Sequence, residues 1–225
     1  MSGTVLAVAG IDTGIGKTYT TGLLAKALLQ QGKKVITQKI VQTGCAGIAE
    51  DILEHRRLMG IEVQDADREG LTCPSVYRYP ASPHLSARLE GTEVDLHRIS
   101  ISTLALQQRY DLVLLEGVGG LLVPLTADIL FADYIRDAGY SLLLVTSPRL
   151  GSINHTLLSI EACRHRGIVI RGLLYNCFQN INKLIADDTR ELLGRYLSKA
   201  GYAAPIIDLR EGQLDFDAVE RLSLS

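Results

Sequence analysis

The chain of 225 residues has no tryptophan, few cysteines and no long apolar run. Cys45, Cys73, Cys163 and Cys177 are widely spaced and never form a Cys-x-x-Cys pair, so we expect reduced thiols rather than disulfides or a zinc site. No apolar stretch approaches the roughly 20 residues of a membrane-spanning helix, and the first residues lack the pattern of a secretory signal. We therefore expect a cytoplasmic protein without a membrane partner.

An excess of one charge is also absent. The 23 lysines and arginines nearly balance the 25 aspartates and glutamates, the formal net charge is -2, and the basic residues are scattered. This distribution argues against nucleic acid as a partner. The hydrophobic content of 47% suffices for one sizeable core, and the chain contains no linker, repeat or low-complexity tract. We expect residues 1–225 to form a single domain.

A glycine-rich loop follows the first apolar stretch. The run that starts at Val5 leads into Gly10-Ile11-Asp12-Thr13-Gly14-Ile15-Gly16-Lys17-Thr18, and a segment with helical apolar spacing comes next. Backbone N–H groups of such a loop close around a polyphosphate, and the following helix adds the positive end of its dipole. We predict that Asp12 to Gly16 surround the phosphates, that Lys17 reaches the outer phosphates, and that Thr18 places its hydroxyl on Mg²⁺.

Two further residues lie at the carboxyl ends of predicted strands, where open α/β sheets bind ligands. Lys39 ends one strand and is either a cation near the transferred phosphate or a solvated lysine. Glu116 follows the apolar residues 112–115 and precedes Gly117-Val118-Gly119-Gly120, a profile typical of a Walker B strand. Its carboxylate is predicted to hold Mg²⁺, with a structural salt bridge as the alternative.

Three polar positions have a structural explanation beside a functional one. Asp51 lies in the first turn of a predicted helix, where the dipole favours a carboxylate, so capping is the simpler explanation from sequence alone. The helix start at Gly151 has free N–H groups that suit an anion, but capping by Ser152 or Asn154 is the alternative. Asn176, at a predicted strand end, either hydrogen-bonds a nucleobase or caps the next turn.

Apolar strands alternate with helices along the chain. We predict strands over 5–10, 34–40, 75–79, 112–115, 141–146, 168–176 and 204–207, and helices from the loop to about 31, over 50–58, 95–108, 128–138, 182–199 and 216–222, with one more ending near 166. This rhythm predicts an α/β fold: a single-domain P-loop NTPase fold with a mostly parallel β-sheet flanked by helices on both faces. By its residues alone, the protein is a Mg²⁺-dependent P-loop nucleotide hydrolase or phosphoryl-transfer enzyme.

Six motifs occur in a specific order and spacing. They are the loop 10–18, Gln38 to Gly44, Ser82-Pro83-His84, Glu116 to Gly120, Leu150 to His155, and the strand-end Asn176. Together they make the chain resemble the dethiobiotin synthetases, ATP-dependent cyclo-ligases of biotin synthesis, over nearly its full length. The resemblance implies that 7,8-diaminopelargonic acid captures CO₂ as a carbamate on one amine. The carbamate then attacks the γ-phosphate of ATP, and the second amine closes the ureido ring and expels phosphate.

The resemblance also implies roles for the residues above. Lys17 and Lys39 would stabilise the carbamate and the transferred phosphoryl group, while Thr18, Asp51 and Glu116 would hold Mg²⁺. Asn176 would contact the adenine of ATP. Substrate contacts are implied for Lys39, for Thr43, and for backbone groups of Gly117, Val118, Gly119 and Gly120.

A homodimer is implied as well, with the substrate site at the subunit interface. In the family, the helix start that matches Gly151, Ser152 and Asn154 receives the carboxylate of a substrate bound in the other subunit. The alternative from another class is a deviant P-loop switch ATPase of the partitioning type, which acts through partner binding. Such proteins carry a signature lysine directly after the first glycine of the loop, and here that position is Ile11.

Overall fold

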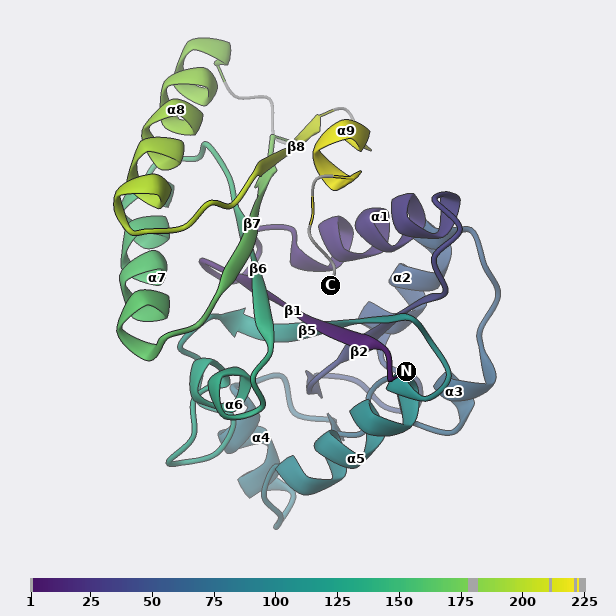
Figure 1. The fold of residues 1–225 in the computed structure, drawn as a ribbon. Helices are drawn as coiled ribbons and strands as arrows, with labels where there is room; N and C mark the ends of the chain where they lie inside the picture. The colour runs from purple at the N-terminus through teal and green to yellow at the C-terminus, as the bar shows by residue number, and fades with distance from the viewer. Residues whose placement is uncertain (1, 178–181, 211, 221, 223–225) are drawn as a thin grey trace.

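A twisted seven-stranded sheet forms the centre of the molecule, as a computed structural model that describes residues 2–177, 182–210, 212–220 and 222 shows (Figure 1). The strand order is β2-β5-β1-β6-β7-β8-β9. The strands are β1 (Thr4–Gly10), β2 (Val35–Lys39), β5 (Leu112–Gly120), β6 (Ser141–Thr146), β7 (Ile170–Asn176), β8 (Ile206–Arg210) and β9 (Gln213–Leu214). All neighbouring pairs are parallel except β8 and β9. The prediction of a mostly parallel sheet is confirmed.

Helices cover both faces of this sheet (Figure 1). The longer helices are α1 (Lys17–Gln30), α2 (Glu50–Met59), α5 (Leu96–Gln107), α7 (Ser152–Arg166) and α8 (Lys183–Lys199), and the short ones are α3 (Asp65–Arg68), α4 (Pro83–Leu89), α6 (Phe131–Asp137) and α9 (Phe216–Glu220). Helix α1 packs with α2 and α9 on one face, and α5, α6, α7 and α8 lie on the other. Two short strands, β3 (Gln42–Thr43) and β4 (Val76–Tyr77), form a separate parallel pair. No described helix is long and apolar enough to cross a bilayer.

The register of the central strands determines where the polar strand ends meet. Leu112 to Leu115 of β5 are buried because helices cover both faces of the sheet. In the β2–β5 ladder, Lys39 pairs directly with Glu116. Residues paired in register point to the same face, so the lysine and the carboxylate are brought together by the sheet itself.

Some predicted boundaries were wrong. Helix α6 begins at Phe131 rather than 128, because the hydroxyl of Thr126 accepts the N–H groups of Asp128 and Ile129 and holds a turn. Strand β8 spans Ile206–Arg210 rather than 204–207, since Pro205 has no N–H to give to a ladder. Strand β9 was not predicted. The last helix ends at Glu220 rather than 222, and position 221 lies outside the described residues.

Candidate active site

The glycine-rich loop lies between β1 and α1 and is supported from β7. Gly16 has a φ of 93°, and a Cβ there would lie 2.3 Å from Nδ2 of Asn176. That nitrogen donates a hydrogen bond of 2.9 Å to the carbonyl of Ile15. The loop therefore requires glycine at position 16, both for its left-handed backbone and for the close approach of the asparagine.

Lys17 is the buried cation of the loop. Lys17 is 7% exposed, and its ammonium nitrogen lies 3.3 Å from the carbonyl oxygen of Asp12. Burial, together with repulsion from Lys39, lowers the pKa of Lys17 to about 8. This cation has no carboxylate in hydrogen-bond contact among the described residues, so a bound polyphosphate would supply the missing counter-charge.

A buried ion cluster lies beside the loop. The Lys39 ammonium is 2.6 Å from Oδ2 of Asp51, 2.8 Å from Oε1 of Glu116 and 3.0 Å from the carbonyl of Gly117. Burial opposes its charge, but the Glu116 and Asp51 carboxylates outweigh that effect and raise the pKa of Lys39. Burial likewise opposes ionisation of Glu116, whereas Lys39 and then His55 hold its pKa well below the usual range. The cluster thus places the side-chain carboxyl groups of Asp51 and Glu116 around one ammonium group.

The oxygen atoms around this cluster fit a magnesium ion. The hydroxyl of Thr18 donates a 3.0 Å hydrogen bond to Oε1 of Glu116, the same oxygen that contacts Lys39. Asp51 reaches the same ammonium from the first turn of α2. A hydroxyl and two carboxylates are hard oxygen ligands of the kind Mg²⁺ prefers. The described residues contain no group of three His, Cys, Asp or Glu that could hold a metal, so the ion would also need oxygens from nucleotide and water.

Sequence reasoning missed two residues that contact this site. His55 is fully buried, and its Nε2 lies 2.9 Å from Oε2 of Glu116. Arg149 pairs with the carboxylate of Asp12 across the loop. The backbone N–H of Thr13 and then Arg149 lower the pKa of Asp12. Neither residue belongs to a motif, although the i, i+4 spacing of Asp51 and His55 on one helix face was a usable signal.

The glycine segment after Glu116 is also part of the site. A side chain at Gly117 would clash, because a Cβ there would lie 2.4 Å from the Phe131 ring. The carbonyl of Gly117 accepts a hydrogen bond from the Lys39 ammonium. Gly119 has a φ of 61°. Val118 and Gly120 are partly exposed, and the carbonyl of Gly10 accepts the N–H of Leu121 directly after them. This segment therefore lies beside the phosphate loop.

The remaining predicted positions lie at the margins of the cluster. Thr43 is half-buried in β3, paired with Tyr77. Gly151 precedes α7 with a φ of 88° and is exposed, as is Asn154. Ser152 is buried, and its hydroxyl lies 3.2 Å from that of Ser147.

Two hollows flank the phosphate loop. One, of about 260 Å³, is lined by Gly14, Ile15, Gly16, Tyr19, Ser147, Arg149 and Asn176. The other, of about 290 Å³, is lined by residues of three segments: Ile11, Asp12, Gly120, Leu121, Leu122, Val123, His155, Leu158 and Ser159. The loop is therefore accessible from both sides, which suits a site that takes a nucleotide and a second substrate.

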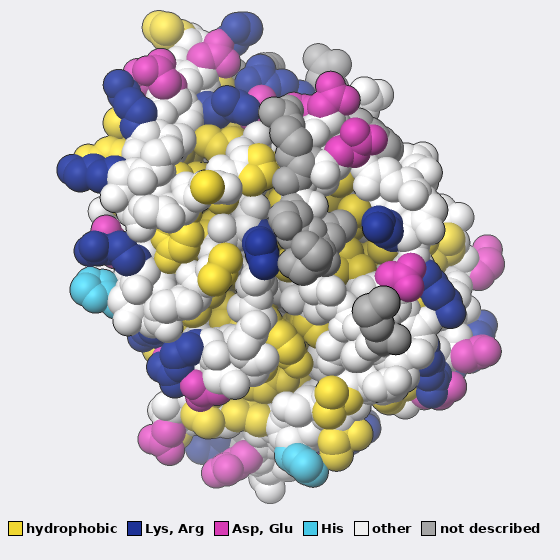
Figure 2. Space-filling view, viewed as in Figure 1, with side chains coloured by type: hydrophobic (Ala, Val, Ile, Leu, Met, Phe, Trp, Pro, Cys, Tyr) yellow, Lys and Arg dark blue, Asp and Glu magenta, His cyan; other side chains and the backbone are white. Residues whose placement is uncertain are grey.

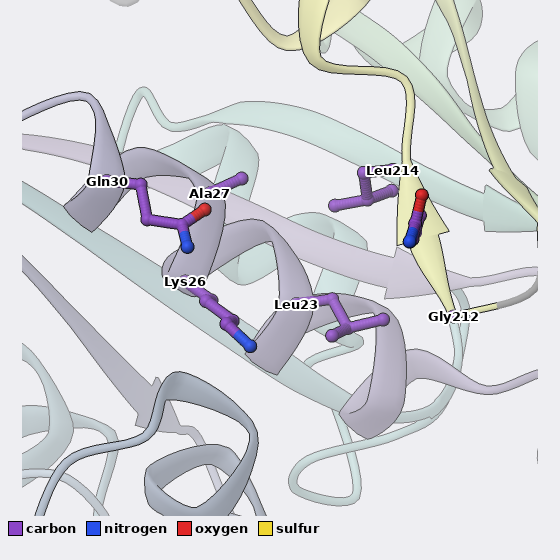
Figure 3. Close-up of a pocket in the computed structure, with 7 residues that line it drawn as sticks. Leu23, Lys26, Ala27, Gln30, Gly212 and Leu214 are labelled. Atoms are coloured by element: carbon purple, nitrogen blue, oxygen red, sulfur yellow. The ribbon is translucent and has the colours of Figure 1, made fainter.

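A separate cavity of about 280 Å³ lies between α1 and β9 (Figure 3). Figure 3 shows Leu23, Lys26 and Gln30 of α1 on one side and Gly212 and Leu214 on the other. None of the residues that line it belongs to the phosphate loop. On the face seen in Figure 2, basic and acidic side chains are interspersed rather than separated.

The chain is similar over nearly its full length to known proteins. Residues 4–208 match a family model described as "AAA domain". The chain is 59% identical to "ATP-dependent dethiobiotin synthetase BioD" of Chlorobaculum tepidum, covering 95% of this chain and 90% of that protein. It is 48% identical to "ATP-dependent dethiobiotin synthetase BioD 2" of Pasteurella multocida, covering 87% of this chain and 92% of the other.

Solved structures show a more distant likeness. The "MinD cell division protein" of Aquifex aeolicus has a TM-score of 0.53 at 17% identity, covering 97% of this chain and 86% of that one. A "ParA Family ATPase" from Chlorobium tepidum has a TM-score of 0.52 at 16% identity, covering 98% and 91%. At such identities the likeness shows the fold alone, and it confirms the predicted P-loop NTPase fold.

Proposed function

This chain belongs to the ATP-dependent dethiobiotin synthetases, and we propose that its P-loop site closes the ureido ring of dethiobiotin from 7,8-diaminopelargonic acid, CO₂ and ATP. The enzyme is a ligase of biotin synthesis. The observation that carries the residue assignment is the Lys39 ammonium, buried between Asp51 and Glu116 directly beside Lys17 and Thr18. A cation held at that place suits a reaction that develops negative charge between a carbamate and a phosphoryl group.

The phosphate loop takes the nucleotide. Backbone N–H groups of residues 12–16 and the start of α1 surround the phosphates, and Lys17 contacts the outer ones. The hollow that includes Gly14, Tyr19 and Asn176 has the position expected for the nucleoside, and Asn176, whose amide nitrogen donates to the carbonyl of Ile15, would contact the adenine.

Thr18, Asp51 and Glu116 would hold Mg²⁺ together with phosphate oxygens. The ion would neutralise phosphate charge and align the γ-phosphate for transfer. Lys39 lies at the same edge of the sheet as Glu116, because the β2–β5 ladder pairs the two residues directly.

The reaction proceeds in three steps. One amine of the diamine attacks CO₂ and loses a proton to give a carbamate. A carbamate oxygen attacks the γ-phosphorus of ATP, giving a carbamic–phosphoric anhydride and ADP. The second amine attacks the carbonyl carbon, closes the ring and expels phosphate, with loss of a second proton. Lys17 and Lys39 orient the reacting groups and stabilise the negative charge that moves between them.

The diamine would lie against Thr43 and the backbone of Gly117 to Gly120, with its carboxylate at a helix start of a second subunit. Gly151, Ser152 and Asn154 form that helix start, and a helix N-terminus favours an anion. Exposed Leu150, at 103%, and the exposed Leu122 and Leu158 at the nearby hollow support an interface with a second copy of the chain. The switch-type ATPase has no comparable support, since Ile11 replaces its signature lysine.

The test is mass-spectrometric detection of dethiobiotin from purified protein. Product should require 7,8-diaminopelargonic acid, bicarbonate, Mg²⁺ and ATP together, and should fall sharply in a Lys39→Ala variant. Lys26→Ala, which removes an exposed lysine of α1, is the matched control and should leave product formation unchanged. ATP hydrolysis that ignores the diamine, without dethiobiotin, would contradict the proposal.

A further inference from the structure

His55 is a buried histidine with one paired nitrogen and one unpaired nitrogen. It lies on α2, four residues after Asp51, and is 0% exposed. Its Nε2 is 2.9 Å from Oε2 of Glu116. Its Nδ1 is buried and has no hydrogen-bond partner among the described residues. Because a carboxylate only accepts hydrogen bonds, Nε2 carries the hydrogen and donates it to Glu116.

The contacts of Glu116 are divided between its two oxygens. Oε1 accepts from the hydroxyl of Thr18 and from the ammonium of Lys39, at 3.0 and 2.8 Å. Oε2 contacts His55. One edge of the carboxylate therefore faces the phosphate loop, and the other is held from α2.

Packing alone does not account for a histidine at this position. A buried nitrogen without a partner costs free energy, and an apolar side chain of similar size would avoid that cost. The ring is retained together with its unpaired Nδ1, and the only described contact made by its polar atoms is with Glu116. The contact with Glu116 therefore accounts for a hydrogen-bond donor at the place of Nε2.

We propose that His55 is a positioning residue that fixes the orientation of the Glu116 carboxylate, so that Oε1 stays directed at Thr18 and the phosphate loop. This inference rests on the proposed function, in which Glu116 helps to hold Mg²⁺ with the nucleotide. Without the donor on Oε2, the carboxylate is free to rotate and to turn both oxygens toward Lys39. Residues that orient metal ligands in this way typically change metal affinity by about 10–100-fold when they are replaced.

The experiment compares three substitutions at this position. In His55→Gln, the amide nitrogen replaces Nε2 and reaches Glu116, whereas the shorter side chain of His55→Asn is equally polar but does not reach it. His55→Leu removes both nitrogens. Thr103→Val is the control, because Thr103 donates a buried 2.8 Å hydrogen bond to Gln38 away from the cluster. Calorimetry measures ADP affinity in EDTA and over a series of Mg²⁺ concentrations, and thermal unfolding is followed in parallel.

The Asn and Leu variants should need about tenfold more Mg²⁺ for half-maximal enhancement of ADP binding, while the Gln variant stays within about threefold of the wild type. Affinity in EDTA should be unchanged in all three. Thr103→Val should lower the melting temperature without changing the Mg²⁺ requirement. Equal Mg²⁺ requirements for the Asn and Gln variants, or loss of folding in all three, would overturn the inference. A wild type without any Mg²⁺ enhancement would overturn the magnesium assignment, and this inference with it.

Discussion

Replacing Lys39 with methionine should destabilise the protein far more than the loss of one hydrogen-bonding group would suggest. The side chain of Lys39 is 5% exposed, that of Glu116 is 0% exposed and that of Asp51 is 25% exposed. Removing the ammonium leaves two carboxylates with no cation between them. Breaking a buried ion pair in this way costs about 3–5 kcal/mol. For a domain of this size, each kcal/mol shifts the melting temperature by about 2–4 °C, so we expect a fall of about 6–20 °C.

Thermal unfolding at several pH values tests this reasoning. In the wild type, Lys39 helps to keep the pKa of Glu116 low, so the ionised carboxylate stabilises the fold at neutral pH and that contribution is lost as the pH falls. In Lys39→Met, burial acts without this opposing charge, so the deficit relative to wild type should be largest at neutral pH and shrink in acid. The double variant Lys39→Met/Glu116→Gln should recover much of the stability. A deficit that does not change with pH, or a double variant no more stable than Lys39→Met, would refute the argument.

Three further predictions concern the phosphate loop. Gly16→Ala should weaken ADP binding by about tenfold or more, because the new Cβ would clash with Asn176. Gly14 also has a positive φ, of 70°, but a Cβ there would meet nothing within 4 Å, so Gly14→Ala should weaken ADP binding less. Calorimetry measures both affinities. Since the pKa of Lys17 is lowered to about 8 and only its charged form binds phosphate, ADP affinity should fall about tenfold from pH 7 to pH 9. Lys17→Arg should abolish that pH dependence, and a persisting slope would exclude Lys17 as its source. In a double-mutant cycle for ADP affinity, Asp12→Asn and Arg149→Met should couple by about 0.5–1 kcal/mol, and strict additivity would show that their ion pair is irrelevant to binding.

Sequence alone predicted the parts of the site whose signals are local. The loop before Lys17 and the apolar strand before Glu116 are continuous segments, so composition and period identify them without knowledge of the fold. Lys39 was ambiguous, because its role depends on the parallel register that pairs it with Glu116. Only the assembled sheet shows that pairing.

Residues that act across long sequence separations were not predictable in this way. His55 contacts a residue 61 positions away, and Arg149 contacts one 137 positions away. No spacing rule connects such pairs in a single sequence. The role of Asp51 was not predictable from the sequence either, because a carboxylate in the first turn of a helix is ordinarily explained by capping. Its contact with Lys39 forms only when α2 packs beside β2. Strand β9 has two residues, too few for any alternation to be recognised.

The paired charges around the loop also determine how a nucleotide is captured from solution. Three cations, Lys17, Lys39 and Arg149, lie near three carboxylates, Asp12, Asp51 and Glu116, although Lys17 is in direct contact with none of them. Their formal charges cancel, so the site projects little net field beyond a Debye length of about 8 Å. Long-range steering therefore contributes little to the encounter rate, and the association rate constant for ADP should vary only weakly with ionic strength. Recognition begins at contact distance, where oriented N–H groups meet the phosphates.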